Sequence, residues 1–231
     1  MAFDFKKEYR DLYLPKTSPT LIDVPAMNFF AVPGCGNPNN ENGSYAEAVS
    51  LLYGLSFTVK MTKKGTWQPE GYFDYVVPPL EGWWFGTGAF DGTRIVDKDA
   101  LQWVSLIRQP DFVTPEVFSW ALEQVTCKKP EVDASRAHFV CFAEGMCAQV
   151  MHLGPYDDEP ATVAALDAFV QQEGYVQDII EPPSAEALMA ELDAQGNIPV
   201  LRLHHEIYLG DPRRTKPENL KTVIRHPVKP A

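Results

Sequence analysis

The chain has 231 residues, of which 45% are hydrophobic and 22% charged, and this composition is typical of a compact folded protein rather than a disordered or fibrous one. Its formal net charge of -11 repels phosphate backbones and anionic lipid surfaces, so we expect neither nucleic acid nor a membrane as a partner. Residues 2–19 lack the apolar stretch of a signal peptide or a membrane span, which predicts a cytosolic protein.

The first half of the chain predicts the order strand, helix, strand, strand. Apolar residues between proline and glycine punctuation indicate the strands, and Ser44 with Glu47 has the spacing of a capping box at the start of the helix. Thr114 followed by Pro115 predicts the start of a second helix, which joins the two halves. The elements expected before it are a strand pair or one broken strand at 19–34, a helix from Ser44 to about Lys63, a strand at 72–77, an extended run at 80–86 and a strand from Leu101 to Pro110.

The second half repeats this pattern without close sequence identity to the first. Its expected elements are a hairpin or strand at 142–156 with Gly145 at its turn, a helix from Pro160 to Gly174, a short helix at 184–194, a strand at 199–212 and its partner at 220–228. The repeat fits a single α+β domain, 1–231, of two modules related by a pseudo-twofold axis, with a ligand cleft between them. We expect the first module at 20–113, the connecting helix at 114–137 and the second module at 138–231.

The cysteines and histidines do not have the spacing of a metal site. Four cysteines lie among apolar neighbours without CxxC spacing, which favours reduced, buried thiols over a disulfide or zinc frame: Cys35, Cys127, Cys141 and Cys147. The motifs of a serine nucleophile, a phosphate loop and a dinucleotide fold are missing from the sequence. We therefore expect neither a metal nor a cofactor.

Alternation along the strand that includes Val200 to Leu209 places polar side chains on one face. His204, Glu206 and Tyr208 share that face, while Leu203 and Ile207 point to the other. If the polar face meets solvent, these are ordinary surface residues; if it meets another layer of the fold, Glu206 and Tyr208 become candidate site residues.

Aromatic residues could form the wall of such a site. In the run LEGWWFG, Glu81 and Trp83 share one face of an extended segment and Trp84 takes the other, so one tryptophan should reach a second apolar environment. Tyr75 and Trp103 could belong to the same wall, although core packing is the favoured role for each of them singly. In the run MHLGPY, His152 and Tyr156 precede a helix start, where Tyr156 lies either in a cleft or in a packed turn.

Several stretches of the sequence resemble the GyrI-like small-molecule-binding domains that also occur in multidrug-sensing transcription regulators. In the second half they are HLGPYDDEPAT, Gly174-Tyr175 and HHEIYLGDPRRTKPENLKTVIRHPV. In the first half, FDFKKEYRDLYLPK, VPAMNFFAVPGCGNPNN and YVVPPLEGWWFG are similar to a stand-alone bacterial branch, whose members resemble cyclopropanoid cyclopropyl hydrolases.

The resemblance implies a duplicated strand-helix-strand-strand fold with the ligand between the modules. It implies that Glu206 is the family's buried acidic residue, with Tyr156 and Tyr208 as further catalytic candidates. The implied ligand is a flat aromatic or hydrophobic small molecule, and the implied reaction is hydrolysis of the cyclopropane in DNA-alkylating genotoxins. Its implied ligand-binding residues are Trp84 and Glu81. Tyr75 and Trp103 of the possible aromatic wall and His152 of the run MHLGPY are further ligand-binding candidates.

Two alternatives to the enzyme remain open at this point. The same residues would serve a non-catalytic drug-binding, sequestering or ligand-sensing protein, in which Glu206 pairs with a ligand cation. A gyrase-inhibitor-like interaction protein is the other alternative, and the sequence does not indicate an oligomeric state. For Glu206, loss of hydration in an aromatic cleft predicts a raised pKa.

Overall fold

The computed structural model describes residues 2–198 and 201–231, and it is built around a nine-stranded sheet. The main path of this sheet runs β1-β8-β11-β10-β3-β6-β2-β7, every pairing is antiparallel, and β9 pairs with β11. The strands are β1 (Thr20–Val24), β2 (Met27–Cys35), β3 (Leu80–Phe85), β6 (Gln102–Gln109), β7 (His138–Phe142), β8 (Gly145–Leu153), β9 (Tyr175–Gln177), β10 (His204–Tyr208) and β11 (Lys221–Pro230), with a separate pair β4 (Phe90–Asp91) and β5 (Arg94–Ile95).

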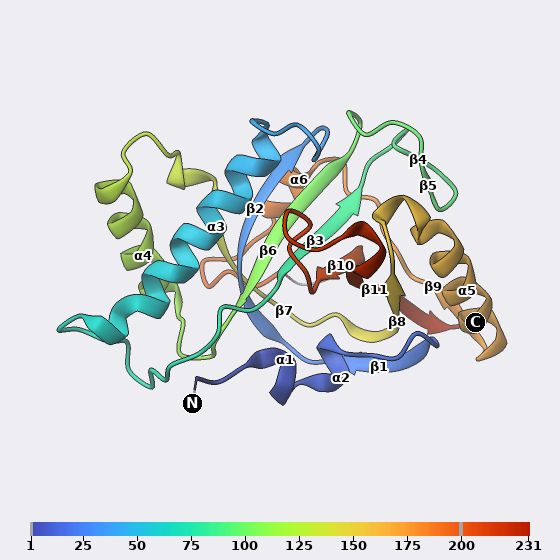
Figure 1. The fold of residues 1–231 in the computed structure, drawn as a ribbon, viewed down its shortest axis with the longest axis horizontal. Coiled ribbons are helices and arrows are strands. Elements are labelled where there is room, and N and C mark those ends of the chain that lie inside the picture. Colours follow the sequence, from blue (N-terminus) through green and yellow to red (C-terminus); the bar gives the residue numbers. More distant parts are fainter. Residues whose placement is uncertain (1, 199–200) are drawn as a thin grey trace.

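The helices lie on both sides of this sheet. They are α1 (Phe5–Glu8), α2 (Arg10–Tyr13), α3 (Ser44–Lys60), α4 (Pro115–Lys128), α5 (Glu159–Gln172) and α6 (Ala185–Met189), with short 3-10 turns η1 (Met61–Lys64), η2 (Ala134–Arg136), η3 (Tyr156–Asp158) and η4 (Pro217–Asn219). Figure 1 shows α3 and α5 in front of the two ends of the sheet, with the segment between β10 and β11 in the space between them. The mixed α+β class predicted from the sequence is confirmed.

Two short interruptions, at 25–26 between β1 and β2 and at 143–144 between β7 and β8, carry the chain from one half of the sheet to the other. The predicted broken strand at 19–34 forms β1 and β2, which pair with different partners: β1 with β8, and β2 with β6 and β7. Of the hairpin or strand predicted at 142–156, the strand is confirmed as β8, whereas no hairpin forms because β7 and β8 lie in opposite halves of the sheet. Gly145, at a φ of +67°, makes the bend there, a backbone conformation that glycine adopts without steric cost.

Alternation along the central strands produces two different faces. We call the face that carries Trp84, Glu206 and Tyr208 the site face; apolar residues from α3, α4 and α5 pack against its two ends. The opposite face carries Trp83, Ile207 and their neighbours, packed against α1, α2 and α6. A core on each side of the sheet therefore fixes the register of β10, because a slip of one residue would exchange its two faces.

Other elements depart from the sequence prediction in ways that local contacts explain. Residues 72–77 form no strand; Tyr75 makes only an isolated bridge to Phe3. The capping box is also wrong: Gly43 is the N-cap of α3, and the Ser44 hydroxyl donates to the carbonyl of Cys35 at 3.1 Å. The connecting helix is shorter than 114–137, ending at Lys128, although Thr114 caps it as predicted.

The remaining departures concern the second half and the thiols. The predicted strand at 199–212 is ordered as β10 from His204, and Pro199 and Val200 lie outside the described residues. All four cysteines are free, but Cys35 and Cys127 are exposed rather than buried because they lie at the ends of β2 and α4. Within residues 2–198 and 201–231, no helix is long and apolar enough to cross a membrane, and no group of three metal-ligating side chains is assembled.

Candidate functional site

The candidate site lies on the site face, where β10 and β3 meet at the centre of the sheet. Glu206 of β10 lies opposite Gly82 of β3, two residues before Trp84 on the same strand. A Cβ atom at Gly82 would come within 2.8 Å of Trp84 Nε1 and 3.3 Å of the Tyr208 hydroxyl. Gly82 therefore provides the space in which these side chains approach one another, a role that the sequence did not reveal.

Glu206 is held by donors on both of its oxygens. His204 Nε2 lies 2.8 Å from Oε1, and the Tyr208 hydroxyl donates to Oε2 at 2.7 Å. Tyr208 in turn accepts a hydrogen bond of 2.6 Å from Trp84 Nε1. The side chain of Glu206 is only 12% exposed, so these contacts replace most of its water.

A second carboxyl group, which sequence reasoning missed, lies against Glu206. Glu159 begins α5 and is 9% exposed, and its side chain is in hydrogen-bonding contact with that of Glu206. Its Oε1 is buried without a hydrogen-bond partner among the described residues. The only signal in the sequence was an acid one residue before the proline that opens the helix.

The prediction of a raised pKa for Glu206 is wrong. Burial by itself would raise the pKa of Glu206, but hydrogen bonds from His204, Tyr208 and Glu159, together with the charge of His204, lower it. The raised pKa belongs to Glu159 instead, because of burial and the neighbouring charge of Glu206. Burial and the charge of Glu206 thus favour the neutral form of Glu159, while the donors around Glu206 favour its charged form.

Aromatic rings surround this pair, as predicted, although not all of the predicted rings take part. Trp84 and Tyr208 touch Glu206 or its partners, and the Tyr156 ring meets the Tyr208 ring edge-on at 5.7 Å. Tyr156 is 37% exposed and so is the open member of the group; burial raises its pKa to about 12. Tyr45 of α3, which the sequence analysis missed, tilts against Trp84 at 5.5 Å.

Trp103 lies one layer below this wall. Its ring is fully buried, edge-on to Tyr45 at 5.0 Å, and its Nε1 donates to the carbonyl of Gly36. Trp103 thus supports the wall from the core, which is the alternative that the sequence analysis left open.

His152 holds the turn that presents Tyr156. Its Nδ1 lies 2.8 Å from the Thr162 hydroxyl and its Nε2 lies 3.0 Å from the carbonyl of Pro155. The side chain is buried and occupied on both nitrogens, so it supports the turn rather than facing a ligand.

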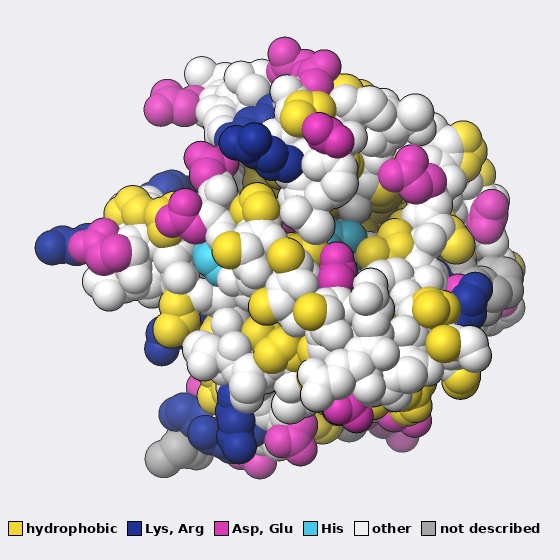
Figure 2. Space-filling model, turned by 90° about the vertical axis from the view of Figure 1, so that its right-hand side faces the viewer, with side chains coloured by type: hydrophobic (Ala, Val, Ile, Leu, Met, Phe, Trp, Pro, Cys, Tyr) yellow, Lys and Arg dark blue, Asp and Glu magenta, His cyan; other side chains and the backbone are white. Residues whose placement is uncertain are grey.

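A pair of histidines links Glu206 to α5. His204 Nδ1 lies 2.6 Å from His226 Nε2, and His226 Nδ1 lies 3.8 Å from Asp167 Oδ1. Burial lowers the pKa of His226. Figure 2 shows the side of the molecule that carries α5, where a histidine side chain is recessed among hydrophobic and acidic side chains. The His204–His226 contact fixes the ring of His204, which donates to Glu206.

Two of the predicted ligand-binding residues lie elsewhere. Glu81 points to the opposite face, where it is 1% exposed, accepts from the Tyr13 hydroxyl at 3.2 Å and lies 3.0 Å from His205 Nε2. Tyr75 is buried against Phe5 and Phe112 near the N-terminal segment. Across the two strands Glu81 lies opposite Ile207, whereas Glu206 lies opposite Gly82. Glu81 and Glu206 therefore point to opposite faces of the sheet.

Glu81 belongs to a buried ionic cluster that also contains Glu144 and Arg225. His205 lies between two carboxylates, with Nδ1 3.0 Å from Glu144 and Nε2 3.0 Å from Glu81. Burial opposes the charged form of His205, but the charge of Glu144 and the hydrogen bonds to Glu144 and Glu81 raise its pKa to about 9. Burial likewise opposes a charged Glu144, yet the charges of His205 and Arg225 lower its pKa to about 2.

The cluster predicts how stability depends on pH. A histidine with a raised pKa stabilises the fold fully below its ordinary value of 6.5, and loses that contribution as the pH rises through about 9. We expect the free energy of unfolding to fall by a few kcal/mol over this interval. Urea unfolding at a series of pH values would measure it, and His205→Gln should give a flatter curve. If the free energy of unfolding changed with pH equally in both proteins, the raised pKa of His205 would be contradicted.

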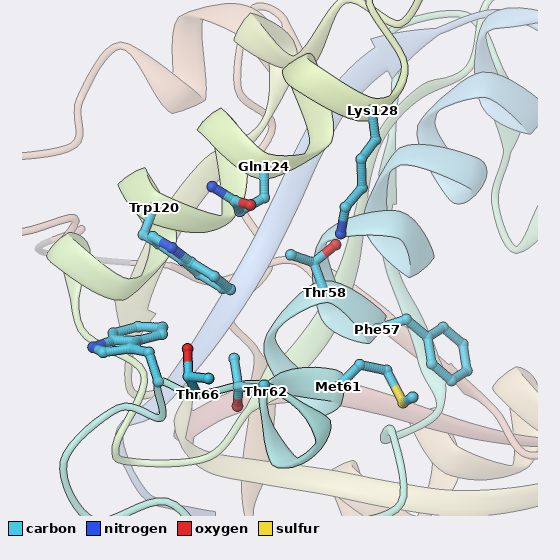
Figure 3. Close-up of a pocket in the computed structure, with 10 residues that line it drawn as sticks. Phe57, Thr58, Met61, Thr62, Thr66, Trp120, Gln124 and Lys128 are labelled. Atoms are coloured by element: carbon cyan, nitrogen blue, oxygen red, sulfur yellow. The ribbon is translucent and has the colours of Figure 1, made fainter.

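Two open pockets of the surface lie away from Glu206. Figure 3 shows one of about 410 Å³ between the end of α3 and α4, where Phe57, Met61, Trp120 and Lys128 are among its walls. Another, of about 550 Å³, is lined by residues such as Glu47 and Arg136. Neither contains a residue predicted for the site.

Comparison with known proteins decides the family. No family model and no curated protein sequence matches the chain. A solved structure of an uncharacterized conserved protein from Listeria innocua is 45% identical over 98% of this chain and 100% of that one, with a TM-score of 0.84. A structure of a hydrolase from Listeria innocua is 43% identical over 98% and 100% of the two chains, with a TM-score of 0.81. The chain belongs to the family of these Listeria innocua proteins.

The family's fold extends to a more distant protein. EcmrR in a cryo-EM structure of an EcmrR–DNA complex is 12% identical, with a TM-score of 0.50, and the match covers 98% of this chain and 63% of that one. At this identity the similarity concerns the fold alone. Membership of the Listeria innocua family rests on the two structures of more than 40% identity and near-complete coverage.

Proposed function

We propose that this chain is a cytosolic GyrI-like protein that binds a flat, largely apolar aromatic molecule at Glu206 and hydrolyses the cyclopropane of cyclopropanoid DNA-alkylating genotoxins. The observation that carries the proposal is a buried carboxylate, Glu206, ringed by Trp84, Tyr156 and Tyr208 and held by donors that keep it ionised. Membership of a family that contains a hydrolase from Listeria innocua supports an enzyme.

The order of the strands supports two duplicated modules. One half of the sheet runs β3-β6-β2 around α3, and the other runs β10-β11-β8 around α5, so each reads strand, helix, strand, strand along the chain. We propose module boundaries at 20–113 and 138–231, with 114–137 between them. A pseudo-twofold axis would then pass between β3 and β10, beside Glu206.

In the proposed reaction, Glu206 positions a water molecule against the methylene carbon of the cyclopropane. As the C–O bond forms, the strained C–C bond breaks, and its electron pair converts the cyclohexadienone into a phenolate. Glu206 takes the proton of the water as this happens. Aromatisation of the ring supplies much of the driving force, so placement of water and modest electrostatic help are sufficient catalysis. Tyr156 and Tyr208 orient the water or the ligand carbonyl.

A second candidate function is sequestration without chemistry. A carboxylate between Tyr45, Trp84 and Tyr156 is also the arrangement that binds an aromatic cation, through charge pairing and cation–π contacts. Product analysis separates the two functions: incubation with a cyclopropane-bearing alkylator gives a hydrated product if the protein is a hydrolase. Recovery of unchanged, protein-bound ligand would support sequestration.

Trp84→Phe should weaken ligand binding about tenfold, because it removes part of an apolar face and the N–H that donates to Tyr208. Titration followed by tryptophan fluorescence measures both the affinity and the share of the signal due to Trp84. Trp120→Phe, in the pocket of Figure 3, is the matched control and should bind as the unaltered protein does. If instead Trp120→Phe weakens binding and Trp84→Phe leaves it unchanged, the ligand binds at α4 and not at Glu206.

A further inference from the structure

We infer that Glu159 is the general acid of the proposed reaction and that it forms with Glu206 a carboxyl dyad whose shared proton closes the catalytic cycle. This inference rests on the proposed function. It follows from the contact between the two carboxyl groups, the burial of Glu159 and the unpartnered Oε1 of Glu159.

The contacts decide which carboxyl group holds the proton. Two buried carboxylates in contact cannot both remain charged, because their repulsion is not screened by water. Glu206 accepts from His204 and from Tyr208, and both contacts stabilise its charged form. Glu159 lies at the N-terminus of α5, which favours a negative charge by less than about 1 kcal/mol at most helix ends. The donors on Glu206 outweigh this, so Glu159 is the neutral acid.

The groups around the two carboxyl groups act on Glu159 in both directions. Asp157, just before α5, adds negative charge beside Glu159 and favours its neutral form, and the Thr222 hydroxyl from β11 contributes in the other direction. The other titratable groups that interact with one or both carboxyl groups are His204 and Tyr208 of β10, His226 of β11, Tyr45 of α3 and Tyr156 of η3.

The dyad balances the protons of the reaction without any other reagent. Glu159 gives its proton to the carbonyl oxygen of the cyclohexadienone while the cyclopropane C–C bond breaks. Water forms the new C–O bond and loses a proton to Glu206, so the product leaves as a neutral phenol carrying the added hydroxyl. The dyad now has its proton on Glu206 instead of Glu159, and transfer across the contact between the two carboxyl groups restores the starting state. Net consumption is one water molecule.

Glu159→Gln is the test of the acid. The amide keeps the size of the side chain and can still donate to Glu206, so the fold and the ligand affinity should remain. Turnover of a cyclopropane-bearing alkylator should fall about 100-fold or more, and the loss of activity at high pH, which reports ionisation of Glu159, should disappear from the profile. Glu173→Gln, an exposed change at the other end of α5, is the control.

A spectroscopic measurement tests the dyad independently of turnover. At neutral pH the infrared spectrum of the unaltered protein should contain the band of a protonated carboxylic acid, and Glu159→Gln should remove it. Absence of that band, or its persistence in the variant, would overturn the dyad. If the band behaves as expected and no hydrated product forms, the reaction is wrong and the shared proton stands. If product forms equally fast with Glu159→Gln, the acid assignment fails and the hydrolase stands.

Discussion

Glu206→Gln is expected to lower turnover of a cyclopropane-bearing alkylator by roughly two to four orders of magnitude, the effect of losing one general base. Glutamine keeps the volume of the side chain and its Oε1 can still accept from His204, so the aromatic wall should persist. Ligand affinity should therefore change far less than kcat. Single-turnover kinetics beside equilibrium binding separates the two quantities.

The control for this variant is Glu123→Gln, an exposed change of the same chemistry on α4. Its turnover should match that of the unaltered protein. Equal turnover of Glu206→Gln and Glu123→Gln would remove Glu206 from the mechanism. A loss of affinity as large as the loss of turnover would instead favour a carboxylate that only binds the ligand.

Arg225→Met should destabilise the protein by about 3–5 kcal/mol, because it removes one of the two positive partners of the buried Glu144 and leaves the cluster with more negative than positive charge. Arg225 is 1% exposed; it donates to Glu144 at 2.8 Å and to the carbonyl of Leu12 at 2.8 Å, and so ties α2 to the opposite face of the sheet. Urea unfolding at neutral pH measures the change. The cluster lies across the sheet from Glu206, so the folded fraction of the variant should retain its turnover.

Arg214→Met is the matched control, since the Arg214 side chain is 87% exposed beside Asp211. Exposed ion pairs contribute about 0–1 kcal/mol, so this variant should unfold close to the unaltered protein. If Arg225→Met proved no more harmful than Arg214→Met, the buried cluster would not be a source of stability.

The sequence predicted the part of the site that follows from the alternation of side chains between the two faces of a strand. Alternation placed Glu206 and Tyr208 on one face of a strand and Trp84 on a face of another, and β10 and β3 bring those faces together. The same alternation separated Glu81 from Trp84. Grouping Glu81 with the site followed from the family resemblance, and the register of β3 against β10 overturns it.

The missed residues depend on how distant elements dock. Glu159 reaches Glu206 only because α5 packs across β8, and Tyr45 reaches Trp84 only because α3 packs across β2 and β6. No local pattern encodes these approaches. Tyr75 was misplaced for a related reason: its segment is irregular, so neither a period of two nor one of 3.6 residues gives its direction.

Hydrolysis at Glu206 can be measured by product analysis with substrate in excess over protein, in water enriched in oxygen-18. We expect the unaltered protein to form several equivalents of a phenol that carries one heavy oxygen on the former cyclopropane carbon, while Glu206→Gln forms far less. Release of only unchanged ligand, in an amount no greater than one equivalent of protein, would contradict hydrolysis at Glu206.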